Sequence, residues 1–586
     1  MSVLTRRPRL LLGLAAVAVA FAAADTYVVV LALPDMMASV GIPLDQLQRA
    51  APIVSGFLLG YVAMLPLIGR IADLRGRVPV LVAALVVFAL GSLVTTFAYD
   101  VTPLVAGRFL QGVGGGGLVP ATLALVADLY PVERRGVPLG VVSAVQELGS
   151  VVGPLFGAVV IALADWRVIF LINLVVGGLL ALAVRRVGSR LSSTTGTQAA
   201  VEPKRGPPDV VGALFLLLAL VAGGLVFTEP PDLLRSVTWG QLFIPVTGSS
   251  RWLTPLGVAS VVLLLLFVVR CGTARRPLVD LVTWWRSLRE ADLVGAGFLG
   301  AALAGVILAF ATADPRIEVF APRGWWYLLG AAIATVAFVL HVRRASGPLV
   351  PRGTLRRTPA WGALLVSFFV GAALIAALID IPIFARTTVY PDSQVLAALV
   401  LVRFLVALPL GAVAGGYLTH LLPAGVVAAI GMALAGLGFV LMSHWGLETL
   451  SSPSATVSLV VGGLGFGLAL APVNAVVLAT TADDVHGLTT ALVVVARMVG
   501  MLVGISALTT IGLRRYYAEA TDLPTPMEAC GGRTRCEAFD TLLRTAGIAQ
   551  EHTVFAGAAI CAVVAALLAV VLFRGAPTRA IASMGG

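Results

Sequence analysis

Sixteen apolar runs divide the chain, and each is long enough to cross a lipid bilayer as an α-helix. A hydrocarbon core about 30 Å thick requires roughly 20 apolar residues in helical form. In lipid a helix satisfies its own backbone N–H and C=O groups, so runs of this length predict an all-α polytopic membrane protein. The runs lie near residues 10–33, 51–68, 78–97, 103–127, 137–163, 167–184, 209–227, 253–270, 291–313, 325–342, 361–385, 394–418, 423–442, 455–480, 487–511 and 553–573.

These runs form groups of six, four and six along the chain. Apolar residues make up 59% of the 586 residues and charged residues only 12%, which excludes a soluble globular protein. We expect a six-helix bundle over 1–184, a linker region with four additional helices over 185–360, and a second six-helix bundle over 361–586. The two sixes resemble an internal repeat, because the spacing Gly136-x9-Gln146-x2-Gly149 recurs as Gly487-x9-Arg497-x2-Gly500.

Arginines gather in alternate loops, which predicts the orientation in the membrane. The loops with Arg70, Arg75, Arg77, Arg134 and Arg135 should face the cytoplasm, while residues 98–102 and 443–454 carry no arginine and should face outward. The even number of helices then places both termini in the cytoplasm, and we expect the cytoplasmic (inner) membrane as the location. The net charge of +11 belongs to these loops and indicates no nucleic-acid partner.

Lys204 is the only lysine in the chain, so the phosphate-binding sequence G-x-x-x-x-G-K-[ST] cannot occur. This excludes a Walker-type ATPase site. We therefore expect no enzymatic activity, no cofactor and no metal site, and any active transport should run on an ion gradient, with the proton gradient as the expected energy source.

A short charged turn, residues 69–77, separates the second and third runs. Its arginines alone fit an ordinary cytoplasmic loop. The spacing of Gly69, Asp73, Gly76 and Arg77 resembles the loop between helices two and three of the major facilitator superfamily. That resemblance implies two six-helix bundles and a turn that latches the cytoplasmic gate.

The fourth run contains Arg108 followed by Gln111 and several glycines. Burying an arginine at the bilayer centre costs about 2.5–3.5 kcal/mol on insertion scales, so this side chain should face a polar interior. Close packing with Arg108 reaching an interface is the structural alternative. The spacing R-x-x-Q-G-x-G is similar to the fourth helix of the same family, which implies a part in proton coupling.

The fifth run carries a second family-like pattern, Gly149-x3-Gly153-Pro154-x2-Gly157. Glycines allow helices to approach closely, and proline allows a helix to bend. The pattern resembles the antiporter motif of the exporting branch, which implies export rather than uptake.

Three ionisable residues, Asp25, Glu147 and Arg497, stand deep within apolar runs. Burial disfavours each charge unless a partner is near, so we expect a triad across the two bundles that loosens when a carboxylate binds a proton. The alternative is a static ion cluster that only fixes helix register. Asp380 and Arg403 form a second expected set of buried charges in the later half.

Longer stretches resemble the mycobacterial exporters of triacylglycerides that work beside a periplasmic lipoprotein. They include residues 25–30, 39–47, 407–416 and 486–501. The resemblance implies Asp25, Glu147 and Arg497 as the functional ion cluster, membrane lipids and a lipophilic substrate as partners, and an extracytoplasmic lipoprotein. We expect a monomer. The extra middle helices depart from that pattern, so a polyspecific drug/proton antiporter and a non-transporting membrane scaffold or lipid-binding partner stay open as alternatives.

The stretch 514–552 is the largest expected outside segment. Cys530 and Cys536 share this polar stretch, and a short disulfide is expected there in preference to a metal site. Phe539, Leu542, Leu543 and Ala546 recur at helical spacing, so the last helix should continue beyond the membrane with an apolar stripe. Either this segment packs on itself, or it guides lipid out of the bilayer.

Overall fold

The computed structural model describes residues 6–43, 47–195, 209–236, 238–247, 250–275, 277–311, 324–391, 393–521, 523–531 and 536–578. Within these ranges the chain is helical and contains no strand. Sixteen helices are long and apolar enough to cross a membrane, which confirms the predicted number.

The sixteen long helices divide into the three groups that the sequence predicts. The first six are α1 (Arg6–Ser39), α2 (Leu47–Arg75), α3 (Arg77–Thr96), α4 (Val101–Leu129), α5 (Gly136–Leu163) and α6 (Arg167–Thr195). The middle four are α7 (Val210–Thr228), α9 (Pro255–Thr273), α11 (Leu293–Ala311) and α12 (Gly324–Arg344). The last six are α13 (Thr358–Thr387), α14 (Gln394–Leu418), α15 (Ala424–Met442), α16 (Pro453–Thr480), α17 (His486–Thr521) and α19 (Glu537–Leu572).

Shorter elements connect these helices. They are the helices α8 (Pro231–Leu234), α10 (Leu281–Glu290) and α18 (Pro526–Ala529), and the 3-10 turns η2 (Val132–Arg134), η3 (Gly240–Phe243), η4 (Arg251–Leu253), η5 (Thr449–Ser451) and η6 (Asp483–Val485). The first bundle was expected to end at residue 184, but α6 continues to Thr195, and residues 196–208 lie outside the described residues.

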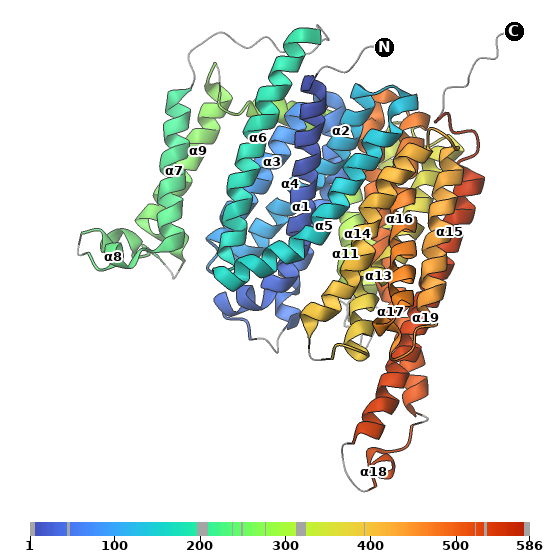
Figure 1. The fold of residues 1–586 in the computed structure, drawn as a ribbon. Helices are drawn as coiled ribbons and strands as arrows, with labels where there is room; N and C mark the ends of the chain where they lie inside the picture. Colours follow the sequence, from blue (N-terminus) through green and yellow to red (C-terminus); the bar gives the residue numbers. More distant parts are fainter. Residues whose placement is uncertain are drawn as a thin grey trace, which may run out of the picture.

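The two groups of six have the same internal arrangement, and they lie side by side in Figure 1, where α5 contacts α14. In the first half α5 packs on α1, with Gly149 against the backbone of Ala20. In the second half α17 packs on α13, with Gly500 against the backbone of Phe368. Gly149 and Gly500 occupy equivalent positions in the repeated spacing, so the repeat read from the sequence corresponds to equivalent helix contacts.

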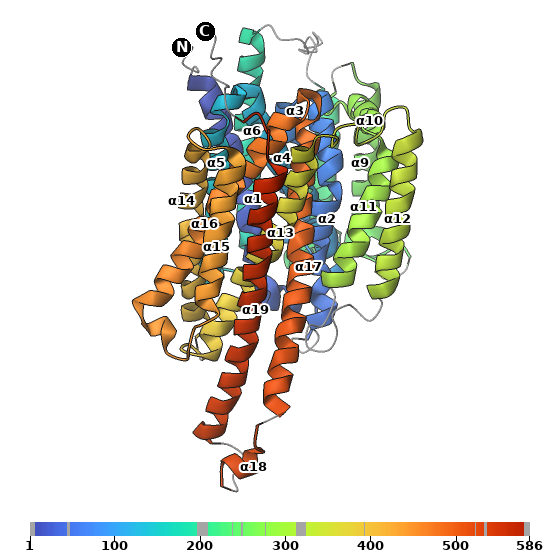
Figure 2. The ribbon, with the colours of Figure 1, turned by 90° about the vertical axis from the view of Figure 1, so that its right-hand side faces the viewer.

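The middle helices form two separate pairs. Helices α7 and α9 pack on each other and stand outside the first half, beside α6 in Figure 1. Helices α11 and α12 form the second pair, next to α2 in Figure 2. Helix α11 contacts both α2 of the first half and α17 of the second, so it spans the boundary between the halves.

Both termini lie at the same end of the helix bundle in Figure 1. Most of the expected turn at 69–77 is helical, because α2 continues to Arg75 and α3 begins at Arg77. Arg70, Arg75 and Arg77 therefore lie on helix ends, and Arg134 and Arg135 lie between α4 and α5, all at that end of the bundle, which we call the arginine face. Helix α18 lies at the opposite end, at the tip of a hairpin formed by the extended ends of α17 and α19 (Figure 2). We call that end the hairpin face.

Candidate functional site

A small cavity lies between the two halves in the middle of the bundle. Its walls come from α4 and α5 of the first half and from α13, α16 and α17 of the second. The cavity offers about 20 Å³ to water-sized molecules, which is room for one or two waters. Its polar lining consists of Ser143, Gln146, Glu147, Ser367, Asn474 and Arg497.

Glu147 and Arg497 face each other across this cavity. Glu147 lies on α5 and Arg497 on α17, and the carboxylate Oε1 is 4.0 Å from the guanidinium Nη1. Only 12% of the Glu147 side chain and 11% of the Arg497 side chain are exposed. The pair therefore joins the two halves through opposite charges in a site largely closed to solvent.

Asp25 and Arg108 form a second ion pair, which lies inside the first half. Arg108 Nη1 on α4 donates to Asp25 Oδ2 on α1 at 2.8 Å, and both side chains are buried. Asn173 on α6 donates to the other carboxylate oxygen of Asp25. The Arg108 guanidinium also lies 4.4 Å from the centre of the Phe57 ring on α2.

Gln111 extends this network to α3. Its Oε1 accepts from Arg108 Nη1 at 2.9 Å, and its Nε2 donates to Ser92 Oγ at 2.9 Å. The network thus contacts α1, α2, α3, α4 and α6, and none of its members lines the central cavity. The four charged residues of the predicted cluster therefore lie as two pairs, Asp25 with Arg108 and Glu147 with Arg497, rather than as one triad.

The turn at residues 69–77 contacts the second half at the arginine face. Asp73 Oδ1 accepts from the backbone N–H of Gly487 at 2.7 Å, and its Oδ2 accepts from that of Leu488 at 2.8 Å. These N–H groups begin α17, where the first turn of a helix lacks intrahelical acceptors and carries partial positive charge. Arg77 pairs with the same carboxylate at 2.6 Å. Asp73 thus closes the two halves against each other at this face.

Further polar contacts cross between the halves at the same face. Arg70 donates to the Asp484 carbonyl at 3.0 Å and Arg77 to the Asp483 carbonyl at 3.3 Å. Arg135 donates to the carbonyls of Ala127 and Tyr130 in its own half and of Leu478 in the other half. Burial lowers the pKa of the Arg135 guanidinium, while neighbouring carboxylates oppose that shift.

Glycines make the same closure sterically possible at two equivalent places. A Cβ added to Gly69 would overlap the carbonyl oxygen of Gly487. A Cβ added to Gly136 at the start of α5 would overlap the carbonyl of Gly416 at the end of α14. Only residues without a side chain allow backbones to approach this closely. Gly76 has φ of 90°, a left-handed conformation that glycine adopts without strain.

The glycine pattern in α5 serves contacts within the first half. Gly149 and Gly153 lie against the backbone of Ala20 and Ala24 on α1, and Gly157 lies against the side chain of Val28. Pro154 lies inside α5. The predicted antiporter motif is thus the surface along which α5 packs on the helix that carries Asp25.

The expected set of Asp380 and Arg403 is corrected by the structure. Asp380 on α13 is buried against Glu551 on α19 and forms a hydrogen bond with its carboxyl group. Arg403 on α14 is half-buried and donates to Thr456 Oγ1 at 3.0 Å. Asp380 is buried as expected, but the sequence did not reveal its partner Glu551, which fell in a stretch assigned to a loop, whereas α19 begins at Glu537.

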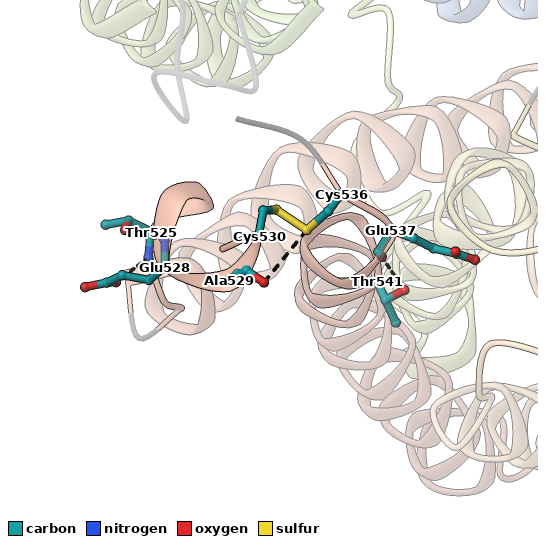
Figure 3. Close-up of a disulfide and its surroundings, with 7 residues drawn as sticks. All are labelled: Thr525, Glu528, Ala529, Cys530, Cys536, Glu537 and Thr541. Carbon is teal, nitrogen blue, oxygen red and sulfur yellow. Dashed lines mark hydrogen bonds between the residues drawn. A yellow bond between two sulfur atoms is a disulfide. The ribbon is translucent and has the colours of Figure 1, made fainter. Parts of the chain in front are cut away.

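The hairpin face carries the disulfide between Cys530 and Cys536, shown in Figure 3. Beside it Glu528 accepts from the backbone N–H of Thr525 at 2.9 Å, and this hydrogen bond holds the pKa of Glu528 below its ordinary value. The expected continuation of the last helix is present, since α19 starts at Glu537 and includes the apolar stripe. Helix α17 also continues to Thr521, so most of this described segment is helical rather than loop.

Several residues of the site were not found from the sequence. Asn173 and Ser92 are uncharged polar residues within apolar runs, and their contacts with Asp25 and Gln111 give them a place in the site. Asp128 lies 3.4 Å from Arg77 and adds a second carboxylate to the contacts of that arginine. Asp128 could have been found from the sequence, because it follows a membrane-crossing apolar run at the end where Arg134 and Arg135 lie.

Comparison with known proteins gives consistent matches. Residues 15–342 match the family model described as Major Facilitator Superfamily. A protein of Mycobacteroides abscessus named triacylglyceride transporter is 33% identical over 522 residues, covering 87% of this chain and 84% of that protein. A protein of Mycolicibacterium smegmatis with the same description is 32% identical over 575 residues, covering 95% and 86%.

A solved structure shows the same fold at lower identity. The human organic anion transporter MFSD10 superposes with a TM-score of 0.55 at 14% identity, covering 96% of this chain and 99% of that chain. At that identity the similarity concerns the arrangement of helices alone.

Proposed function

Since the chain belongs to the major facilitator superfamily and is a multi-pass membrane transporter, we propose that it exports a triacylglyceride or related lipid in exchange for protons. The family membership agrees with the resemblance seen in the sequence. The proposed cycle is alternating access, in which the two halves open first at one membrane face and then at the other.

One observation carries the proposal. Glu147 and Arg497 come from different halves, face each other across the central cavity, and are largely shielded from solvent. Binding a proton would neutralise Glu147 and remove its attraction for Arg497, so protonation would change how strongly the halves hold together. A charge pair at this boundary can therefore couple proton binding to rocking of the halves.

The closed arginine face and the disulfide on the hairpin face bear on the proposed orientation in the membrane. The Asp73 hydrogen bonds and the two glycine contacts close the arginine face. We propose that this face is cytoplasmic, as the arginine bias predicts, and that the protein lies in the inner membrane with both termini inside. The disulfide on the hairpin face supports the same orientation, because disulfides persist in oxidising compartments.

The cargo is proposed from relatives and from the nature of the site. The two matched bacterial proteins are named triacylglyceride transporters. A cavity with room for one or two waters cannot hold a triacylglyceride, so loading requires the other state of the cycle. The hairpin of α17 and α19 carries the half-buried residues Phe539, Leu542 and Leu543, and we propose that it guides lipid away from the membrane, toward an extracytoplasmic lipoprotein.

We expect Asp25→Asn to abolish lipid export while the protein still inserts and folds. Asparagine keeps the size of the side chain but removes the charge that Arg108 and Asn173 bind. The buried Arg108 would lose its counter-ion, at a cost of roughly 3–5 kcal/mol for breaking such a pair. The measurement is the amount of triacylglyceride outside cells that express equal amounts of wild type or variant.

Asp165→Asn on the exposed turn before α6 is a matched control. It removes a charge whose ion pair with Arg167 spans 3.5 Å, while the asparagine Oδ1 can still accept from the Arg167 backbone N–H, as Asp165 Oδ1 does at 2.8 Å. That control should export lipid normally. Unchanged export by Asp25→Asn would show that the Asp25–Arg108 pair is not needed for transport. Loss of export of a drug, with lipid unaffected, would favour the alternative of a polyspecific drug/proton antiporter.

A further inference from the structure

Two buried carboxyl groups meet in the second half, away from the central cavity. Asp380 on α13 is 5% exposed and Glu551 on α19 is 1% exposed, and their side chains are hydrogen-bonded to each other. Glu551 Oε1 also accepts from Gln550 Nε2 at 3.2 Å. Glu551 Oε2 finds no N–H or O–H donor among the described residues.

This geometry requires a proton. An ionised carboxylate only accepts hydrogen bonds, so two carboxylates can bond to each other only when one of them is protonated. Like charges in contact cannot both ionise in a buried site. The shared proton can lie on Asp380 or on Glu551.

The surroundings offer no positive charge in place of the proton. Among the described residues neither carboxyl group takes part in an ion pair with a cation. His552, the neighbour of Glu551, bonds instead to the backbone carbonyl of Trp445 at 2.6 Å.

The other charged groups on α13, α17 and α19 lie elsewhere or have other partners. Arg497 pairs with Glu147, Arg515 pairs with Glu519, and His486 lies at the start of α17 on the arginine face. The exposed ones are Arg386, Arg514, Glu537, Asp540 and Arg544, and His444 is exposed in the loop after α15. The weaker titratable groups Tyr516, Tyr517 and Cys561 carry no positive charge.

Aromatic side chains close the site. Phe384 follows Asp380 by one turn of α13, and Phe555 follows Glu551 by one turn of α19. Their ring centres lie 6.4 Å apart, and the Trp445 ring lies 5.1 Å from Phe384 and 5.8 Å from Phe555. These three buried rings keep water from the contact, which strengthens the penalty for a second charge.

The pair lies where the hairpin joins the bundle. Asp380 lies two turns before the end of α13 at Thr387, and Glu551 lies 14 residues after the start of α19 at Glu537. The first part of α19 forms one arm of the hairpin (Figure 2). We propose that Asp380 and Glu551 form a second proton-binding site, which holds the hairpin to α13 while they share one proton and releases it when that proton leaves. The inference rests on the proposed function in one respect: proton exchange during each transport cycle would release the hairpin from α13.

The sign of the pH dependence follows from linkage. The contact binds a proton that the separated carboxylates would not hold, so raising the pH weakens the contact. Glu551→Gln imitates the protonated state, because its amide can donate to an ionised Asp380 at any pH. The hairpin of that variant should stay attached when the pH rises.

The test uses the full chain, purified and placed in lipid discs. Infrared absorption of protonated carboxyl groups is followed from about pH 5 to about pH 9, in wild type, Glu551→Gln and Asp380→Asn, each carrying Glu147→Gln so that the other proposed proton-binding carboxyl group gives no band. We expect a band in wild type that disappears on raising the pH, and its loss at all pH values in both variants. Glu537→Gln, at an exposed position on the same helix, is the control and should keep the band.

A spin-label distance reports the movement separately. Labels at Arg386→Cys on α13 and Arg544→Cys on α19, with Cys271 and Cys561 changed to serine, should move apart as the pH rises in wild type but not in Glu551→Gln. A titrating band that persists in both Glu551→Gln and Asp380→Asn, or labels that move equally in wild type and Glu551→Gln, would overturn the shared-proton site. If the infrared band behaves as expected but the protein transports no lipid, the shared-proton site is supported and only the proposed function is rejected.

Discussion

Gly69→Ala is expected to stop transport by preventing closure of the arginine face. The new Cβ would overlap the carbonyl oxygen of Gly487 and lie 2.9 Å from the Ala491 Cβ. The carbonyl belongs to the first turn of α17 and cannot move aside unless the whole helix moves away. The halves would then stay apart at this face, and the Asp73 hydrogen bonds to Gly487 and Leu488 could not form.

Cysteine labelling measures this opening directly. Thr490 is fully buried and lies behind the gate, where its hydroxyl approaches the Pro120 carbonyl at 3.4 Å. In a background with Cys271 and Cys561 changed to serine, Thr490→Cys should react slowly with a membrane-permeant maleimide. Adding Gly69→Ala should make the reaction fast.

Gly178→Ala on α6 is the matched control, because no atom lies within 4 Å of the Cβ it would gain. That control should transport and label like wild type. Full transport by Gly69→Ala, with Thr490→Cys still protected, would mean that close approach at this glycine is not needed for the cycle.

Arg497→Ala is expected to abolish transport and to destabilise the protein. It leaves Glu147 buried between the halves without its only cationic partner among the described residues. Removing one partner of a buried ion pair costs roughly 3–5 kcal/mol. Melting temperature and lipid flux, measured on the same preparations, should both fall.

Glu147→Gln separates the charge effect from the packing effect. Glutamine fills the same space and leaves no buried carboxylate, so the protein should fold, but its transport should no longer respond to a pH gradient. Combining it with Arg497→Ala should restore part of the lost stability without restoring transport, which is the sign of two directly coupled residues. Ser143→Ala, a neutral change in the wall of the same cavity, should transport normally. Transport by Glu147→Gln that still follows the gradient would exclude Glu147 as the coupling residue.

The helices could be predicted from the sequence because lipid imposes one simple requirement. Each crossing needs about 20 apolar residues with internal hydrogen bonds, and loops must be polar. The end of α17 at Thr521 and the start of α19 at Glu537 were harder to predict. Both lie at the hairpin face, where polar residues are no longer a sign of a loop. The split of the middle helices into two pairs depends on tertiary packing and has no local signal.

The charged residues of the site could be selected from the sequence because a charge in an apolar run is costly and therefore needs a partner. The sequence could not predict which carboxylate pairs with which arginine. Asp25 points into the first half toward Arg108, whereas Glu147 points to the boundary between the halves, and that difference depends on the rotation of α1 and α5 about their axes. The same limit explains why Asp380 was grouped with Arg403 instead of Glu551.

The gate was more predictable because its chemistry is local in sequence. A carboxylate beside the start of a helix, flanked by glycines, needs only the approach of a second helix to act as a latch. The structure supplies that helix as α17, with Gly487 at the contact. Gly136 and Gly416 make a second contact of this kind, and each of the two contacts joins one glycine of the first half to one glycine of the second.

Proton-driven lipid movement is the claim on which the whole account depends, and one flux measurement tests it most directly. The purified protein is placed in vesicles containing a fluorescent triacylglyceride, and a pH gradient is imposed across the membrane. The account predicts that lipid leaves the vesicles to an acceptor when protons can flow inward through the hairpin face, and that reversing or collapsing the gradient stops it. Equal lipid release with and without the gradient, in vesicles that hold the gradient stably, would contradict it.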